Sequence, residues 1–277
     1  MKYKLICIDM DGTLLNSNHK ISKISKSTLR EAYNRGVHVV ISTGRTYVDA
    51  VAYSDLIGLN CPIIACTGAI IKEKHSNDVI HKSVIDEELC KKLLKIFNKH
   101  NVKPIFNSVY KMYCGDLKLK IGMEFLKIIG IINRDVKLNY IKNEEEWFDV
   151  FKYEKNNIIK CEIMNGNRRK IYNIRKELEN LSGIEITSSS NHNIEITKKG
   201  ASKGRAIEIL ASYYNIKHEE IIAIGDSYND ISAIEFAGMG IAMGNANERV
   251  KKKSNYVTDS NDNDGVAKVI EKFILKN

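Results

Sequence analysis

Residues 4–15 read KLICIDMDGTLL, an apolar run that changes abruptly into a stretch with two carboxylates. A continuous apolar run is typical of a strand that is covered on both faces of a parallel sheet. Asp9 and Asp11 follow two residues apart, where their charges repel each other unless a cation or an incoming group relieves them. Gly12 permits the unusual backbone turn that directs both side chains to one place. A polar turn that merely ends a strand is the simpler alternative.

Four further apolar runs have the same character and are separated by amphipathic helical patterns; they are residues 38–43, 62–67, 221–225 and 240–243. One helical pattern ends at Gly36, a typical C-terminal stop, and another begins after Ser202, a good N-cap. The alternation predicts an α/β fold with a doubly wound parallel sheet. Ligands of such sheets bind beyond the carboxyl ends of the strands. The polar residues at these ends are Asp9, Thr43, Thr67 and Asp226.

The middle of the chain interrupts this alternation. Residues 86–100 predict a capped helix, mixed short strands and helices follow, and the α/β pattern resumes at Lys203. We therefore expect two domains, with residues 1–82 and 190–277 as the core and residues 83–189 as an inserted α/β domain. Four aromatic residues of the insert either stack on a substrate ring or pack the insert's own core; they are Tyr110, Tyr113, Trp147 and Phe148.

The composition indicates a globular protein of the cytoplasm. The chain has 277 residues, a net charge of +9 and 43% hydrophobic residues, but no apolar run near the roughly 20 residues that span a bilayer. Acidic residues interrupt the apolar N-terminus too early for a signal peptide. The lysines are spread over the chain, which favours a solvated surface over a nucleic-acid site. None of the six cysteines has a zinc-site spacing, so we expect buried, reduced thiols.

Three more motifs lie at strand ends or helix starts of the predicted core. They are GDSYND at residues 225–230, STGR at residues 42–45 and GASKG at residues 200–204. The first offers oxygen ligands that suit Mg²⁺, and the second offers a hydroxyl and free amides that can hold a phosphate. The third places Lys203 at a helix start, where a bound anion would explain its charge. Each alone also fits a helix cap or a surface lysine, but together they agree on one rim of the sheet.

The motifs DMDGTLL, STGR, SKG and GDSYND, in this order, resemble those of the haloacid dehalogenase-like hydrolases, and within them the Cof-type phosphatases. The resemblance covers nearly the whole chain, through motifs in the core and by position and size in the insert. It implies an Mg²⁺-dependent phosphatase that hydrolyses small phosphate monoesters through an aspartyl-phosphate intermediate. Sugar phosphates and cofactor phosphates such as pyridoxal phosphate are the implied substrates. The insert resembles the α/β cap called C2B, which would act as a lid and determine substrate specificity.

The resemblance also implies a role for each matching residue. Asp9 would attack phosphorus, and Asp11 would protonate the leaving oxygen and then activate water. Mg²⁺ would be held by Asp9, the backbone carbonyl of Asp11 and Asp226. Asp230 would support the metal site. The residues implied around the phosphate group are Met10, Gly12, Thr43, Gly44, Lys203 and Asn229.

One position departs from the family's pattern. Thr67 stands where an Asn is common, and a hydroxyl can replace some hydrogen bonds of an amide although it reaches less far. We therefore expect Thr67 to lie near the substrate.

Two other functions share parts of this pattern. A phosphomutase uses the same core, and a phospho-accepting, receiver-type signalling module also has clustered acids, a hydroxyl and a lysine in an α/β fold. The chain length, the insert and the acid pair after the first strand count against the receiver. The expected partner is a small-molecule phosphate ester, with no nucleic acid and no membrane, and the expected assembly is a monomer or homodimer.

Overall fold

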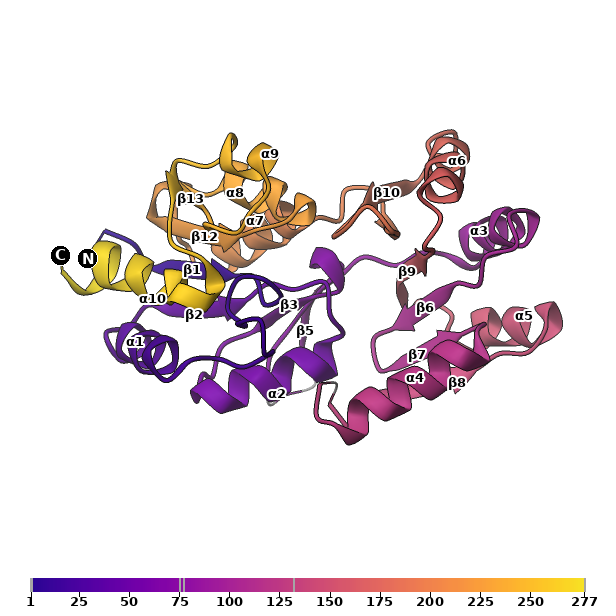
Figure 1. The fold of residues 1–277 in the computed structure, drawn as a ribbon, viewed down its shortest axis with the longest axis horizontal. Helices are drawn as coiled ribbons and strands as arrows, with labels where there is room; N and C mark the ends of the chain where they lie inside the picture. Colours follow the sequence, from indigo (N-terminus) through magenta and orange to yellow (C-terminus); the bar gives the residue numbers. More distant parts are fainter. Residues whose placement is uncertain (1, 75, 77, 132, 277) are drawn as a thin grey trace. The chain divides into compact units, whose positions relative to one another are not determined.

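The computed structural model describes residues 2–74, 76, 78–131 and 133–276, and the chain divides into two units (Figure 1). The first unit consists of Met1–His81 and Ser202–Asn277, and the second, called the insert below, consists of Lys82–Ala201. The insert runs beyond residue 189, where the sequence pattern places its end. The reason is that the strand Asn193–Lys198 pairs with two strands of the insert.

In the described part of the first unit, five parallel strands form a sheet in the order β14-β13-β12-β1-β2. Their bounds are β1 Leu5–Ile8, β2 His38–Ile41, β12 Ile221–Gly225, β13 Met239–Ala242 and β14 Tyr256–Val257. Every residue of β1 is buried, and because successive side chains point to opposite faces, both faces of the sheet are covered. The prediction of a buried strand in a parallel sheet is confirmed.

Helices of the first unit form two groups by their mutual contacts. α1 (Lys23–Asn34) contacts α2 (Tyr47–Ile57) and α10 (Gly265–Ile270), whereas α7 (Lys203–Tyr213) contacts α8 (Ile231–Phe236). A short helix, α9 (Glu248–Lys251), precedes β14, and a π-helix (Glu271–Leu275) continues α10. Ser202 caps α7 as predicted, because its hydroxyl oxygen accepts a hydrogen bond from the backbone N–H of Arg205.

The run at residues 62–67 differs from its prediction as one more strand of the parallel sheet. β3 (Ile63–Ala65) meets the end of β2 at a single parallel bridge between Ser42 and Ile64. It pairs antiparallel with β4 (Ile70–Lys72), and a three-stranded sheet runs in the order β3-β4-β5, with β5 at Val79–Lys82. The chain reverses in a one-turn helix (Cys66–Gly68) whose residues all have positive φ, so β4 returns beside β3.

In the described part of the insert, six strands form a sheet in the order β10-β11-β9-β6-β7-β8. Their bounds are β6 Ile105–Ser108, β7 Lys111–Cys114, β8 Lys137–Tyr140, β9 Ile158–Met164, β10 Ile184–Thr187 and β11 Asn193–Lys198. The pair β7 and β8 is parallel, and the other neighbouring pairs are antiparallel.

The insert has its own apolar core, built from one face of this sheet and from three helices. These helices are α3 Glu87–Lys99, α5 Glu144–Tyr153 and α6 Arg168–Leu178, whereas α4 Leu117–Ile128 contributes no residue to this core. Asp86 caps α3, in agreement with the prediction. Trp147 and Tyr113 belong to this core and Phe148 packs against it, whereas the side chain of Tyr110 is 52% exposed. Three of the four aromatic residues therefore pack the insert.

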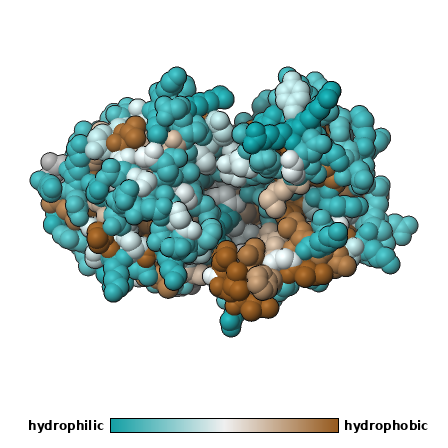
Figure 2. Space-filling model, viewed as in Figure 1, coloured by the Kyte–Doolittle hydropathy of each residue, from teal (hydrophilic) through white to brown (hydrophobic). Residues whose placement is uncertain are grey.

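The surface of the insert includes an apolar face on α4 and the turn after it. Leu117, Ile121, Phe125, Ile128 and Ile129 are at least half exposed. Figure 2 shows hydrophobic surface in this region.

All six cysteines of the chain are buried and free, as the sequence predicts.

Among the residues that the structure describes, no helix combines the length and the apolar character that crossing a membrane requires.

Candidate active site

Two carboxylates meet where adjacent parallel strands end. Asp9 follows β1 and Asp226 follows β12, and these strands pair in register with Ile8 opposite Ile224. The backbone N–H of Asp9 donates to the carbonyl of Ile224 over 3.0 Å, which continues the ladder by one residue. Carboxylate oxygens of Asp9, Asp226 and Asp230 lie within 4.8 Å of one another. The structure thus brings together three acids that the sequence places at one rim.

A buried lysine joins these acids. Lys203, the first residue of α7, is 1% exposed, and its Nζ lies 2.7 Å from Oδ1 of Asp9 and 2.6 Å from Oδ1 of Asp230. Burial alone would lower the pKa of the Lys203 ammonium, but the charges of Asp230 and Asp9 raise it above its ordinary value. The two carboxylates therefore account for a positive charge at the positive end of a helix.

Negative charge still exceeds positive charge in this cluster. Burial, and next the charge of Asp230, raise the pKa of Asp9 well above its ordinary value despite the nearby Lys203. The same two causes raise the pKa of Asp226 to about 6. Crowded carboxylates show such shifts when no further cation shares the site. The donor set is all oxygen, which fits a hard cation such as Mg²⁺ better than Zn²⁺.

Asp230 is bonded to its own loop through one oxygen and to Lys203 of α7 through the other. Its Oδ2 accepts hydrogen bonds from the backbone N–H groups of Asp226 and Ser227, both at 3.0 Å, while Oδ1 faces Lys203. The hydroxyl of Thr13 donates to Oδ1 of Asp226 over 2.8 Å, a contact that the sequence analysis missed. These bonds fit Asp230 to a supporting position and leave Asp9 and Asp226 as the better ligands for a cation.

Asp11 takes a different partner. Its side chain is 49% exposed. The guanidinium of Arg45 donates a hydrogen bond to each of its oxygens, from Nε to Oδ2 over 2.7 Å and from Nη2 to Oδ1 over 2.6 Å. A third nitrogen of Arg45 lies 2.6 Å from Oδ2 of Asp49, in the first turn of α2. Sequence reasoning gave Arg45 no role. The spacing of Arg45 and Asp49, four residues apart at a helix start, was the available signal.

Backbone geometry at Gly12 explains why the chain can turn here. Gly12 has a φ of +77°, and a Cβ at this position would lie 2.5 Å from Oδ2 of Asp226. Its carbonyl accepts a hydrogen bond from Nδ2 of Asn245 over 2.8 Å. Met10 is fully buried, so its side chain belongs to the core and only its backbone is available to a ligand.

A backbone hydrogen bond joins the turn after β2 to the turn after β3. Thr43 is buried at the end of β2, and its carbonyl accepts the N–H of Thr67 over 3.0 Å. Gly44 is half-buried in the turn between Thr43 and α2. Thr67 has a φ of +59°, a costly conformation for a β-branched residue. A Cβ on Gly68 would lie 2.2 Å from the carbonyl oxygen of Ser202, so this turn abuts the start of α7.

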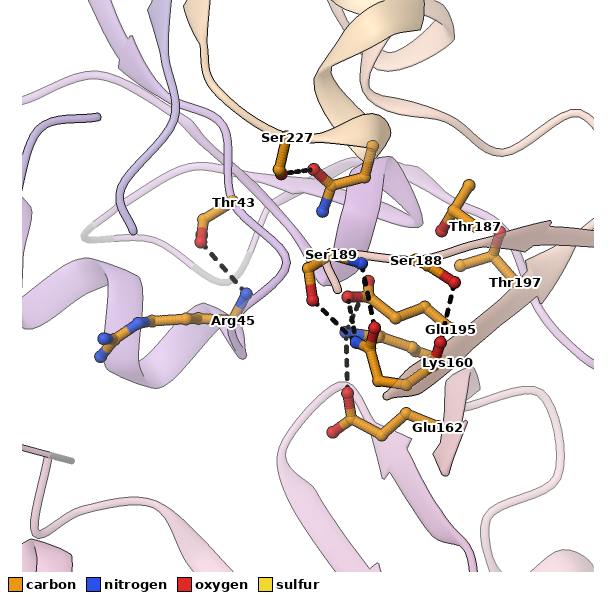
Figure 3. A network of polar contacts seen from close by, with 12 residues as sticks. Thr43, Arg45, Lys160, Glu162, Thr187, Ser188, Ser189, Glu195, Thr197 and Ser227 are labelled. Carbon is orange, nitrogen blue, oxygen red and sulfur yellow. Dashed lines mark hydrogen bonds and ion pairs between the residues drawn. The ribbon is translucent and has the colours of Figure 1, made fainter. Parts of the chain in front are cut away.

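Asn229 lies in the loop that follows β12. It is 6% exposed, and its Oδ1 accepts a hydrogen bond from the hydroxyl of Ser227 over 2.7 Å. Figure 3 labels Ser227, Thr43 and Arg45 among the residues that it draws, and a dashed line joins Arg45 to Thr43. That line is the hydrogen bond of 3.1 Å from the backbone N–H of Arg45 to the hydroxyl oxygen of Thr43.

Comparisons with known proteins agree with this geometry. The profile of the haloacid dehalogenase-like hydrolases matches residues 6–270. The chain is 33% identical over 273 residues to the 5-amino-6-(5-phospho-D-ribitylamino)uracil phosphatase YcsE of Bacillus subtilis, covering 98% of this chain and 96% of the relative. A haloacid dehalogenase-like hydrolase structure from B. subtilis superposes with a TM-score of 0.86 at 29% identity, over 98% of this chain and 100% of the other. The subclass IIB sugar phosphatase BT4131 gives a TM-score of 0.81 at 26% identity, with 98% of each chain covered.

The chain belongs to the haloacid dehalogenase-like hydrolase family. It is a phosphatase, a hydrolase of phosphoric monoesters. Its α/β core and the insert with a sheet of its own match the fold of the solved relatives.

Proposed function

We propose that the chain is an Mg²⁺-dependent phosphatase of small phosphate monoesters that works through an aspartyl phosphate on Asp9. The observation that carries this proposal is the buried Asp9 carboxylate at the end of β1, with the Lys203 ammonium 2.7 Å away. A carboxylate can approach a phosphate group only if other groups neutralise part of the negative charge. Lys203 is placed to supply one such charge.

The reaction has two displacements at phosphorus. An oxygen of Asp9 attacks, the bond from phosphorus to the ester oxygen breaks, and Asp11 gives that oxygen its proton. Asp11 then takes a proton from water, whose oxygen attacks phosphorus and releases phosphate and Asp9. Lys203 and Thr43 hold the phosphoryl oxygens during both steps, and Asn229 lies close by.

Asp9, Asp226 and the backbone carbonyl of Asp11 would hold the Mg²⁺, and Asp230 would support them. When bound, the cation neutralises charge on the phosphoryl group. The raised pKa of Asp226 supports this assignment, because burial and next the charge of Asp230 disfavour the ionised carboxylate, a cost that a bound cation would offset. Thr13 orients Asp226 through its hydrogen bond.

The insert would determine which ester is cleaved, since the residues proposed above touch only the phosphate, the metal and the attacked phosphorus. The names of the two relatives described above point to polyhydroxylated esters, one a ribitylamino-uracil phosphate and the other a sugar phosphate. Sugar phosphates and cofactor phosphates are therefore the proposed class. A cytoplasmic location and a monomeric or homodimeric state belong to the same proposal.

The test is the release of phosphate from p-nitrophenyl phosphate in the presence of Mg²⁺. Asp9→Asn should lower kcat by about 10⁴-fold or more, because the nucleophile is lost. Asp262→Asn, at an exposed aspartate of the same unit, is the matched control and should retain turnover. Near-normal activity of a folded Asp9→Asn protein would overturn the mechanism.

A further inference from the structure

The insert contains a pocket of its own. The pocket has a volume of about 250 Å³ and lies where the end of α3, the chain before β6 and the start of α5 meet. All of its lining residues belong to the unit Lys82–Ala201, so the pocket is complete without the first unit. None of them takes part in the proposed chemistry. We call this cavity the insert pocket.

One side of the insert pocket is apolar. Pro104, Ile141 and Trp147 line it, and all three are buried. The indole ring of Trp147 is held within the apolar core of the insert, with its centroid 5.2 Å from that of Phe106 and 5.7 Å from that of Phe151. A rigid apolar wall of this kind suits the hydrocarbon part of a small ligand.

The indole N–H of Trp147 is a donor without an acceptor. It donates to no described residue, although the side chain is only 4% exposed. A Cβ on Gly115 would lie 3.5 Å from Cζ2 of Trp147, and this carbon adjoins the ring carbon that is bonded to Nε1. The edge of the ring that carries the N–H is therefore directed toward Gly115, which lines the insert pocket. Buried indole N–H groups normally have an acceptor, so a ligand is the expected partner here.

Two lysines add positive charge that the insert pocket does not balance. Lys103 and Lys142 line the pocket, and neither ammonium forms an ion pair or a hydrogen bond with a described residue. Among the described lining residues the only carboxylate is that of Glu144, which already accepts a hydrogen bond from Nδ2 of Asn98 over 3.0 Å. Lys142 also precedes Asn143, the N-cap of α5, where the helix dipole favours negative charge. The pocket thus has a surplus of donors and of positive charge.

Water is the simpler occupant. A water molecule can accept the indole N–H, and exposed ammoniums are ordinarily solvated. A pocket that holds only water, however, has no preference for a charged organic molecule over a neutral one of the same shape. The two alternatives therefore differ in a property that can be measured.

We propose that the insert pocket binds a small organic anion. The carboxylate or phosphate group of this ligand would accept from the N–H of Trp147 and pair with Lys103 and Lys142. Its apolar part would cover Pro104 and Ile141, and the volume of about 250 Å³ suits a molecule with one ring or a few carbon atoms. The inference does not rest on the proposed function, because no residue of the catalytic cluster is involved.

The first test uses the unaltered protein without Mg²⁺ and three probes of similar shape. Benzoate carries a carboxylate, phenylphosphonate carries a phosphate-like group that cannot be hydrolysed, and benzamide is the neutral counterpart of benzoate. Trp147 is the only tryptophan of the chain, so its fluorescence reports directly on the insert pocket.

We expect a saturable change of fluorescence with at least one of the two anions, and calorimetric titration should give the same Kd. This Kd should be at least about 10-fold lower than that of benzamide, because hydrogen bonds to charged groups are the stronger ones. The anion that binds more tightly identifies the natural ligand as a carboxylate or a phosphate compound. A Kd of benzamide as low as that of the better anion, or no saturable change with either anion, overturns the inference.

The second test assigns the binding to the insert pocket. An added Cβ at Gly115 would make ordinary contacts, at 3.5 Å with Trp147 and 3.7 Å with Lys103, so Gly115→Val should fill the pocket without unfolding the insert. It should raise the Kd of the anion at least about 10-fold, since a methyl-sized change in a small pocket has effects of this order. The double variant Lys103→Met with Lys142→Met should raise the Kd about 5- to 10-fold. Lys176→Met, at an exposed lysine of α6, is the control and should leave the Kd unchanged.

Two results contradict this location. One is an unchanged Kd in Gly115→Val and in the double lysine variant when both melt as the unaltered protein does, because the anion would then bind elsewhere. The other is the loss of binding in Asp9→Asn, which would place the anion in the catalytic cluster of the first unit. If Gly115→Val fails to fold, Gly115→Ala, which adds only the Cβ, decides by the same criterion.

Discussion

Two buried lysines in this chain each face two carboxylates, one in each unit. Lys203 contacts Asp9 and Asp230 at 2.7 and 2.6 Å, and Lys160 contacts two glutamates at 3.1 Å each. Lys203 lies at a helix start beside strand ends, where a third acid, Asp226, adds negative charge. Lys160 lies within β9, opposite Asn107 of β6 in the register of the sheet. The two clusters therefore differ in their surplus of negative charge, because only the first has a third carboxylate and so fits the cation that we propose there.

Metal binding separates the two clusters most strongly. Removal of metal with EDTA should abolish phosphatase activity, and Mg²⁺ should restore it. Calorimetric titration should show Mg²⁺ binding that is lost in Asp226→Asn and kept in Glu195→Gln, because Mg²⁺ prefers the crowded oxygens of the first cluster. Full activity of metal-free protein, or loss of binding only in the glutamate variant, would contradict the comparison.

Asp11→Asn should lower kcat for alkyl phosphates by about 10²–10⁴-fold, the usual scale of general acid–base catalysis. The rate of the first step should fall less with p-nitrophenyl phosphate, because its leaving group needs no proton. The measurement is single-turnover release of the alcohol from the alkyl ester and of p-nitrophenol from the aryl ester, because the leaving group departs in the first step. Equal losses in the first step for both would assign Asp11 a role other than proton transfer.

Lys203→Met should lower kcat by about 10²–10³-fold, as does the removal of one donor to a transition-state oxygen elsewhere. Lys160→Met, which lies in the insert and outside the first cluster, should lower kcat much less. Both variants should lose about 3–5 kcal/mol of unfolding free energy, because each leaves buried carboxylates unpaired. Urea denaturation measures the free energy of unfolding, and steady-state kinetics measures kcat. A larger fall in kcat for Lys160→Met than for Lys203→Met would reverse the assignment.

Arg45→Lys should have the smallest effect, a loss of about 10-fold in kcat for alkyl phosphates, because a lysine cannot grip both oxygens of Asp11. Arg35→Lys, in an exposed pair with Glu31, is the matched control. If both variants behave alike, the contact between Arg45 and Asp11 does not position the acid.

The first cluster was predictable because its residues follow apolar strands. The carboxyl ends of parallel strands share one edge of a sheet, so the sequence alone predicts that Asp9 and Asp226 lie close together. The two hydrogen bonds from Arg45 to Asp11 were not predictable, since they depend on the path of the chain through a turn. The antiparallel return of β4 beside β3 was not predictable for a similar reason. The chain reversal between them uses left-handed backbone at Cys66 and Thr67, residue types that rarely adopt it.

The ion pairs of Lys160 with Glu162 and Glu195 left a weaker signal in the sequence. Residues 158–164 read IIKCEIM, and the two charged residues of this apolar run are two positions apart, hence on one face. That pattern indicates a polar sheet face. It does not reveal that Glu195, thirty-five residues after Lys160, pairs beside it, because antiparallel register depends on the turns between the strands.

The covalent intermediate on Asp9 is the central claim, and an acid-quench experiment tests it most directly. The Asp11→Asn protein is mixed with ³²P-labelled p-nitrophenyl phosphate and Mg²⁺, quenched in acid within the first turnover, and digested for peptide mapping. We predict an acid-stable label on the peptide that contains Asp9, and none when Asp9→Asn is added to the same protein. Label on another residue, or continued phosphate release from the Asp9→Asn variant at the rate of Asp11→Asn, would contradict the account.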